Sequence, residues 1–316
     1  MLPDGKTIRA ALVFTWDDNV SGAESVAEVF DKYGMKTTFF VNTAAYDNWK
    51  YRVRNPFMKG MFQQIVDNGH EVGSHTRNHK VLTQASEEEI KMELYSSATD
   101  IQKLWGIVPS TMSHPTSKYN VAIDSLVHLY YLDSRYSIDK DRDSTIRYMQ
   151  VRTAYDFSYY KKQLDLYFAS NANRYVFGGH QLTDYNGYEP MPETVLDSLL
   201  NYIVDKYDED CWVTTFENMT MYGLLRDNIT VNNHNGTISI DLGAMAALLE
   251  KYPHPSASIT LCFPDENLDF ASDGLQDFWY INGDSYCTID LRKSTKLQYG
   301  IIDKNVEPQH AMRGEK

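Results

Sequence analysis

Short apolar segments alternate with amphipathic segments along most of the chain. From residue 8 to about residue 225, apolar runs typical of buried strands are followed by segments with helical periodicity. Such strand–helix repeats predict an α/β fold with a parallel sheet, most simply a distorted (β/α) barrel of about seven strands. Functional groups are then expected at the carboxyl ends of the strands. We expect strands at 10–14, 36–42, 107–113, 130–136, 175–177 and 212–215, and one more strand that begins directly after Gly69. Helices are expected at 21–33, 57–67, 86–105, 120–128, 156–170 and 192–207.

The pattern changes after about Arg226. The dipeptide Asn235-Gly236 lies between two alternating segments and predicts a β-hairpin. Further strands are expected at 258–263, 278–281 and 286–291, and a helix at 244–251. We therefore expect two domains, an α/β domain over residues 1–227 and a small β-rich domain with a tail over residues 228–316.

The bulk composition narrows the possible partners. Of 316 residues, 42% are hydrophobic and 23% are charged, which is typical of a soluble globular protein. Because 30 basic residues face 43 acidic ones, with a net charge of −13, no nucleic-acid partner is expected. No apolar run is long enough for a membrane span, and none precedes the first strand as a signal peptide would. As written, the sequence predicts a cytoplasmic protein, or an extracytoplasmic one if an export signal was removed.

Two adjacent carboxylates, Asp17 and Asp18, follow the first apolar segment. Like charges this close resist joint ionisation unless a cation or a proton lies between them. The simpler interpretation is that one of them caps the helix that begins near Ser21.

A second segment changes that balance. His75 and His79 are four residues apart after another predicted strand, and this spacing puts both imidazoles on one face of a helical turn. With Asp18 they form a set of two histidines and one carboxylate, which suits one divalent metal ion with open positions. Zinc is the usual metal for such ligands, and cobalt, nickel or manganese would also fit.

These motifs resemble those of the polysaccharide deacetylases, the NodB-like carbohydrate esterases, over roughly residues 8–225. Residues 15–18 are similar to the family's Thr-Phe-Asp-Asp signature, and residues 75–79 to its His-x-x-x-His metal motif. The resemblance implies that Asp17 is the general base and that Asp18, His75 and His79 hold the metal. His180 stands where the family keeps its general acid, although a histidine satisfied within a loop is the alternative.

The sequence departs from the family pattern at three places. The third motif, Arg-x-Pro-Tyr, falls on residues 113–116, so Ser113 replaces the arginine that orients the base. Residues 133–136 lie near the fourth motif but lack its tryptophan, and Gly178 stands where a leucine is usual. Arg135 or Arg77 could replace the missing arginine, and Arg135 is slightly favoured because it lies at a strand end.

The resemblance implies a metal-dependent hydrolase that removes acetyl groups from an N-acetylated or O-acetylated carbohydrate. Asp17 would take a proton from the attacking water and His180 would protonate the leaving group. Two alternatives stay open: a hydrolase of another amide or a cyclic imide on the same fold, and a non-catalytic carbohydrate-binding relative. In the second domain, Trp279 or Tyr280 could bind carbohydrate, but such aromatic residues are more often part of a core.

Overall fold

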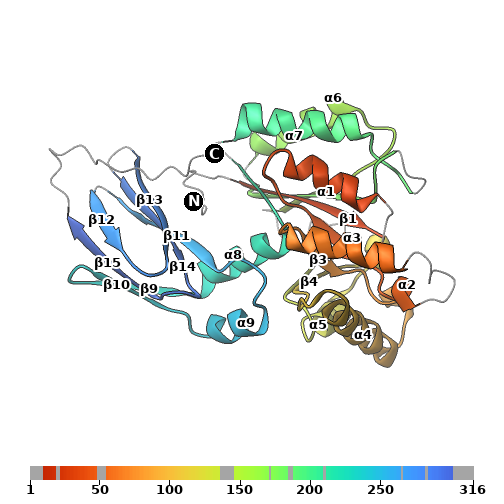
Figure 1. Cartoon of the computed structure of the whole chain (residues 1–316), viewed down its shortest axis with the longest axis horizontal. Coiled ribbons are helices and arrows are strands. Elements are labelled where there is room, and N and C mark those ends of the chain that lie inside the picture. Colours follow the sequence, from red (N-terminus) through yellow and green to blue (C-terminus); the bar gives the residue numbers. More distant parts are fainter. Residues whose placement is uncertain are drawn as a thin grey trace. The chain divides into compact units, whose positions relative to one another are not determined.

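The computed structural model describes residues 10–18, 22–47, 55–135, 146–170, 172–183, 188–208, 211–264, 266–281 and 284–301. The chain separates into two compact units, one over Ala10–Met219 and one that contains the described residues from Thr220 onward (Figure 1). Each unit is described by itself below. No helix in the described part is long and apolar enough to cross a membrane.

The first unit is built on an eight-stranded parallel sheet, counted over its described residues. The strand path runs β5-β4-β3-β2-β1-β7-β6, and β8 also pairs with β1. Since β7 and β8 pair with the same residues of β1, they occupy opposite edges of it, and β8 shares its edge with β2. The predicted distorted (β/α) barrel is therefore confirmed. The strands are β1 (Ala10–Asp17), β2 (Thr38–Val41), β3 (Glu71–Ser74), β4 (Thr111–Ser113), β5 (Asp133–Arg135), β6 (Ile146–Gln150), β7 (Arg174–Gly179) and β8 (Cys211–Thr214).

Helices accompany these strands, as the amphipathic segments predict (Figure 1). Ser86 and Glu89 form a capping box at the start of the longest helix, α4, and Gly106 ends it in the left-handed conformation. The helices of this unit are α1 (Ala23–Asp31), α2 (Ala44–Asp47), α3 (Asn55–Asp67), α4 (Glu87–Trp105), α5 (Val121–Val127), α6 (Phe157–Phe168), α7 (Glu193–Tyr207) and α8 (Phe216–Asn228), which continues into the second unit.

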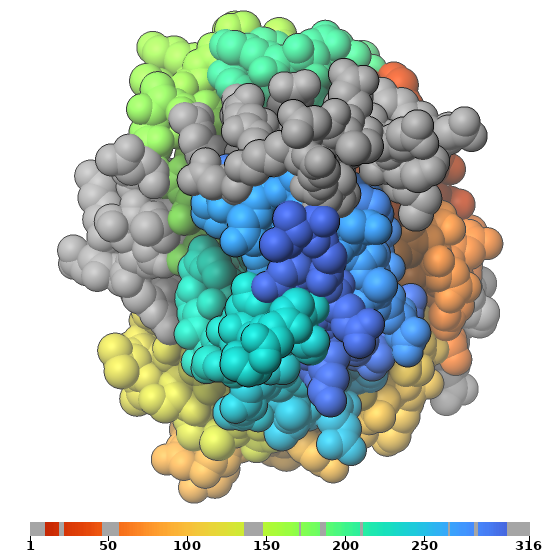
Figure 2. All heavy atoms as spheres, turned by 90° about the vertical axis from the view of Figure 1, so that its left-hand side faces the viewer, coloured from red at the N-terminus to blue at the C-terminus, as the bar shows by residue number. Residues whose placement is uncertain are grey.

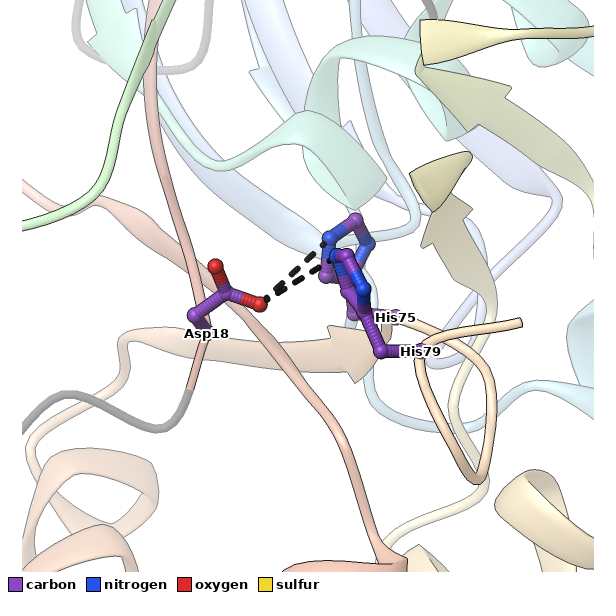
Figure 3. Close-up of side chains that lie close together, drawn as sticks. All are labelled: Asp18, His75 and His79. Carbon is purple, nitrogen blue, oxygen red and sulfur yellow. Dashed lines mark ion pairs between the residues drawn. The ribbon is translucent and has the colours of Figure 1, made fainter. Parts of the chain in front are cut away.

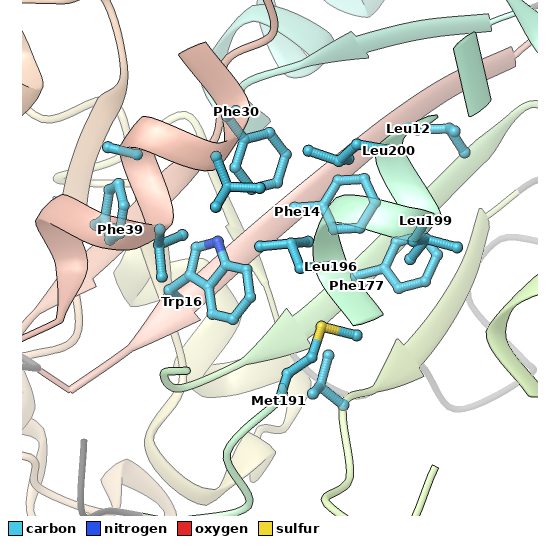
Figure 4. Packing of buried hydrophobic residues seen from close by; sticks show 14 of the residues in the cluster. Leu12, Phe14, Trp16, Phe30, Phe39, Phe177, Met191, Leu196, Leu199 and Leu200 are labelled. Atoms are coloured by element: carbon cyan, nitrogen blue, oxygen red, sulfur yellow. The ribbon is translucent and has the colours of Figure 1, made fainter. Parts of the chain in front are cut away.

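Alternation along β1 separates two faces of the sheet. Leu12, Phe14 and Trp16 pack in the larger apolar cluster, with leucines of α7 and Phe30 of α1 (Figure 4). Val13 lies in a different cluster, with residues of β2, β7 and α8. Because side chains on a strand alternate, Asp17 lies on the same face as Val13, which is the inner face of the barrel. The period of two thus turns the carboxylate of Asp17 away from α1 and α7.

Three strands are shorter than the sequence predicts, and the first of them, expected at 36–42, spans only Thr38–Val41. The strand expected at 107–113 begins only at Thr111, after Pro109, which has no N–H to donate to a sheet. The strand expected at 130–136 begins at Asp133 because Tyr131 still donates its N–H to the carbonyl of Val127 at the end of α5. Strand β6 and helices α2 and α8 were not predicted.

The second unit contains two antiparallel sheets, whose atoms are cyan to blue in Figure 2. The predicted hairpin is confirmed, since Asn235 and Gly236 both have positive φ between β9 and β10. Trp279 is buried and stacks on Tyr286, so it belongs to a core. The sheets are β12 (Leu268–Ala271), β15 (Lys296–Ile301), β10 (Thr237–Asp241) and β9 (Thr230–His234), and β11 (Ser258–Phe263), β14 (Asp284–Asp290) and β13 (Leu275–Ile281), with helix α9 (Met245–Lys251).

A buried carboxyl group lies at the first residue of β3. Glu71 accepts hydrogen bonds from the Thr38 hydroxyl (2.8 Å), the Thr111 hydroxyl and the backbone N–H of Glu217 (2.9 Å). Its own burial, together with the nearby charge of Glu217, raises the pKa of Glu71 to about 8. The folded protein therefore retains a proton on this group at pH values where the unfolded chain has lost it.

Raising the pH should destabilise the wild-type protein more than a Glu71→Gln variant. The stabilisation from the bound proton is complete below the unfolded pKa of about 4.3 and is lost as the pH rises through about 8. Urea unfolding at about pH 5.5 and about pH 8.5 measures the difference. The exposed Glu88→Gln variant should keep the wild-type pH dependence. An equally steep loss in Glu71→Gln would show that another group is responsible.

Candidate active site

Polar side chains follow the carboxyl ends of several parallel strands. Asp17 is the last residue of β1, Arg135 is the last residue of β5, and His75 and His180 directly follow β3 and β7. These ends lie at one edge of a parallel sheet, where the loops can bring them together. Asp18 has a positive φ of 63°, which turns the chain away from the strand direction directly after Asp17.

Asp18, His75 and His79 form a compact group (Figure 3). One ligand atom from each lies within 4.8 Å of the other two. Nε2 of His75 is 3.8 Å, and Nε2 of His79 is 3.6 Å, from Oδ1 of Asp18. Asn42 donates a hydrogen bond of 2.9 Å to the same oxygen and so orients the carboxylate.

The segment that joins the two histidines is not the helical turn expected from their spacing. Thr76 and His79 both have positive φ. The Thr76 hydroxyl accepts the N–H of Lys80, and the Ser74 hydroxyl accepts the N–H of Thr76. These side-chain bonds replace the helical pattern. The imidazole centroids still lie 4.9 Å apart, so the expected juxtaposition arises from a different backbone.

The protonation of His75 suits a metal ligand. Its Nδ1 lies 2.9 Å from the carbonyl oxygen of Ser113, which can only accept, so Nδ1 carries the hydrogen. Burial lowers the pKa of His75 despite the neighbouring carboxylates, which favours the neutral ring. The lone pair of Nε2 is then free on the side of Asp18. Two imidazole nitrogens and one carboxylate oxygen fit a divalent metal ion.

Asp17 forms an ion pair with Arg135 on the inner face of the barrel. Both side chains are buried, and Nη2 of Arg135 donates to Oδ2 of Asp17. Burial alone would raise the pKa of Asp17, but the charge of Arg135 and its hydrogen bond outweigh burial and hold the pKa below its ordinary value. Oδ1 of Asp17 is buried and has no hydrogen-bond partner among the described residues. Asp17 is thus an ionised carboxylate with one open acceptor.

Arg77 lies elsewhere. Its Nε is 3.1 Å from Oδ2 of Asp100 in α4, and the Thr43 hydroxyl donates to the same oxygen at 2.9 Å. Arg77 therefore links the turn between the two histidines to α4. Of the two arginines considered for the orienting role, the structure brings Arg135 to Asp17.

His180 lies at the margin of the ligand group. Its Nε2 is 4.0 Å from Oδ2 of Asp18, and its side chain is 16% exposed. The ring meets Tyr188 edge to face, with centroids 5.0 Å apart. Nδ1 is buried without a hydrogen-bond partner in the part of the chain that the structure describes. His180 and Asp17 thus both lie beside the group formed by Asp18, His75 and His79.

Two residues of this site were missed from the sequence. Ser113 offers its carbonyl to His75 and its hydroxyl to Arg135. Tyr148 accepts a 2.8 Å hydrogen bond from Nη1 of Arg135. Ser113 drew attention only as the position of a missing arginine, and Tyr148 lies on the unpredicted strand β6.

Comparison with known proteins agrees with the motifs. Residues 4–132 match the family model for polysaccharide deacetylases, a range that contains Asp17 and the group of Asp18, His75 and His79 and ends before Arg135. The peptidoglycan-N-acetylglucosamine deacetylase PgdA of Listeria monocytogenes is 25% identical over 142 residues, 44% of this chain and 28% of that protein. The uncharacterized protein YlxY of Bacillus subtilis is 24% identical over 121 residues, 38% of this chain and 34% of that protein. The chain thus spans about a third or less of these relatives.

A structural comparison extends the likeness in fold over more of the chain. The crystal structure of a proposed polysaccharide deacetylase from Mycobacterium smegmatis has a TM-score of 0.51 and 16% sequence identity. The match covers 70% of this chain and 91% of that one, so the two share the fold of this region. By its motifs and by the family model, the chain is similar to the polysaccharide deacetylases over residues 4–132.

Proposed function

We propose that the chain is a metal-dependent hydrolase that removes acetyl groups from an N-acetylated or O-acetylated carbohydrate. The observation that carries this proposal is the position of Asp17. Its Oδ1 has no partner among the described residues, and its Oδ2 is 3.8 Å from Nε2 of His75. A carboxylate kept ionised beside a metal site is suited to take a proton from water.

We assign the metal to Asp18, His75 and His79. The neutral ring of His75 and the short separations within the group support this assignment. Zinc is the expected ion, and cobalt, nickel or manganese would also suit the ligands. When bound, the ion supplies Lewis-acid activation of a carbonyl group and of water.

Two residues beside the proposed metal site carry out the proton transfers, Asp17 as the acceptor and His180 as the donor. Asp17 accepts the proton of the attacking water at Oδ1, while Oδ2 stays paired with Arg135. The guanidinium holds the carboxylate in one orientation and keeps it ionised. His180 donates a proton to the leaving nitrogen or oxygen as its bond to the acyl carbon breaks. The products are acetate and the deacetylated sugar.

Purified protein should bind about one divalent ion and release acetate from acetylated sugars, and His75→Ala should lose both properties. Elemental analysis and acetate release, with and without added zinc, measure the two effects. His128→Ala, at a half-exposed histidine of another region, is the matched control and should keep both. Equal metal content in wild type and His75→Ala would overturn the ligand assignment.

A panel of substrates would distinguish the proposed deacetylase from another amide hydrolase and from a non-catalytic relative. The name of the Listeria relative makes N-acetylglucosamine oligomers and peptidoglycan strands the first substrates to test. Small amides and cyclic imides belong in the same panel, since hydrolysis of these alone would favour the other hydrolase class. Sugar binding without release of acetate would favour a non-catalytic relative.

A further inference from the structure

We propose that Tyr148 is a positioning residue that holds Arg135 against Asp17, and that Gly178 is required because only glycine leaves space for this contact. The inference rests on the proposed role of Asp17 as the base. It concerns neither the proposed metal ligands nor the two groups that transfer protons, but the residues that support Arg135.

Tyr148 contacts Arg135 in two ways. Its phenol oxygen accepts a 2.8 Å hydrogen bond from Nη1, and the guanidinium carbon lies 5.6 Å from the centre of its ring. Phe40 lies on the guanidinium as well, at 5.5 Å. Tyr148 itself packs against the inner apolar cluster, which fixes its ring. The phenol is therefore a rigid acceptor for one side of the guanidinium.

Arg135 has few other anchors. Its side chain is 3% exposed, so water does little to orient it. Nη2 donates to Asp17 and to Ser113, and Nε is buried without a partner among the described residues. Since Nη1 donates to Tyr148, loss of the phenol oxygen would remove this hydrogen bond and let the planar group rotate.

Gly178 leaves the space that this arrangement occupies. A Cβ at this position would overlap the Tyr148 phenol oxygen and would lie 2.5 Å from Nη1 of Arg135 and 2.8 Å from Cζ of Tyr148. Its φ is not in the left-handed region, so space and not backbone conformation requires glycine here. The tyrosine, the arginine and the glycine thus depend on one another.

The expected consequence is a change in turnover with little change in substrate binding. Arg135 acts on the orientation of Asp17, which matters when the water proton is transferred. Tyr148→Phe keeps the ring and removes only the oxygen. It should lower kcat about tenfold, as for one lost hydrogen bond to a charged group, and leave KM nearly unchanged.

A matched control separates positioning from simple packing. Tyr131 is also buried, and its hydroxyl donates a 2.9 Å hydrogen bond to the carbonyl of Leu94. Tyr131→Phe should lose comparable thermal stability and keep wild-type kcat. If both variants lower kcat alike, the effect of Tyr148 is structural and the proposal is overturned.

A second pair of variants tests the dependence on Gly178. Gly178→Ala should lower kcat about 10²-fold, because the new methyl group displaces the phenol or the guanidinium. The double variant Tyr148→Phe/Gly178→Ala should be no slower than Gly178→Ala alone, since both changes act on the same group. Effects that multiply would mean two independent roles and would contradict the proposal.

Crystal structures make the test independent of activity. In Tyr148→Phe the guanidinium of Arg135 should leave Oδ2 of Asp17 or occupy two orientations. An Arg135 that stays ordered on Asp17 in that variant overturns the inference, whatever the kinetics. A wild-type protein that hydrolyses nothing in the panel would instead count against the proposed function, and the structures would still decide the role of Tyr148.

Discussion

Replacing Asp17 by Asn should lower turnover of acetylated sugar by about 10²–10⁴-fold, the usual effect of losing a general base. The amide keeps the shape of the side chain but cannot take the proton from water. Because Asp17 is not one of the three assigned ligands, elemental analysis should find the metal retained. Steady-state kinetics on the best substrate of the panel measures the effect.

The same variant should also be less stable than the wild type. Arg135 would remain buried while its counter-charge is gone, and an unpaired buried charge is strongly unfavourable. A folded, metal-containing Asp17→Asn variant that turns over at the wild-type rate would exclude Asp17 as the base.

Replacing Arg135 by Met should lower the free energy of unfolding by about 3–5 kcal/mol, the usual result of removing one partner of a buried ion pair. Asp17 is then left buried without that positive charge. Turnover should fall by about 10²-fold, because the carboxylate is no longer held in position. Urea unfolding of the metal-free protein and steady-state kinetics measure the two losses.

A double variant distinguishes the charge from the packing. Asp17→Asn/Arg135→Met removes both charges and should recover most of the lost stability while remaining inactive. Arg77→Met serves as the comparison, since its pair with Asp100 is partly exposed and should contribute much less to stability. Equal losses from Arg77→Met and Arg135→Met would contradict the importance that we give to burial.

Much of the fold could be predicted from the sequence because each level of pattern agrees with the next. The apolar run before Asp17 indicates a strand, and its period of two decides that Asp17 faces inward. The capping pair Ser86 and Glu89 marks the start of α4 without any tertiary information. Asn235 and Gly236 specify their hairpin in the same local way.

The remaining parts depend on contacts between distant segments. The strand-end position of Arg135 favours it as the partner of Asp17, but nothing in the sequence indicates that Tyr148 lies on the other side of its guanidinium. Among the described strands, β6 pairs with β7 alone, so its place follows from the topology of the sheet. The turn from His75 to His79 shows the same limit, because four-residue spacing fits a helical turn equally well.

Ser113 contacts His75 and Arg135 through different parts of the residue. The carbonyl that fixes the ring of His75 belongs to the main chain, whereas the hydroxyl that meets Arg135 belongs to the side chain. A mutation at this position can therefore change the contact with Arg135, the partner of Asp17, and leave the contact with His75 in place. Replacing Ser113 by alanine would remove the hydroxyl and keep the carbonyl, so residue 113 allows the two supports to be varied separately.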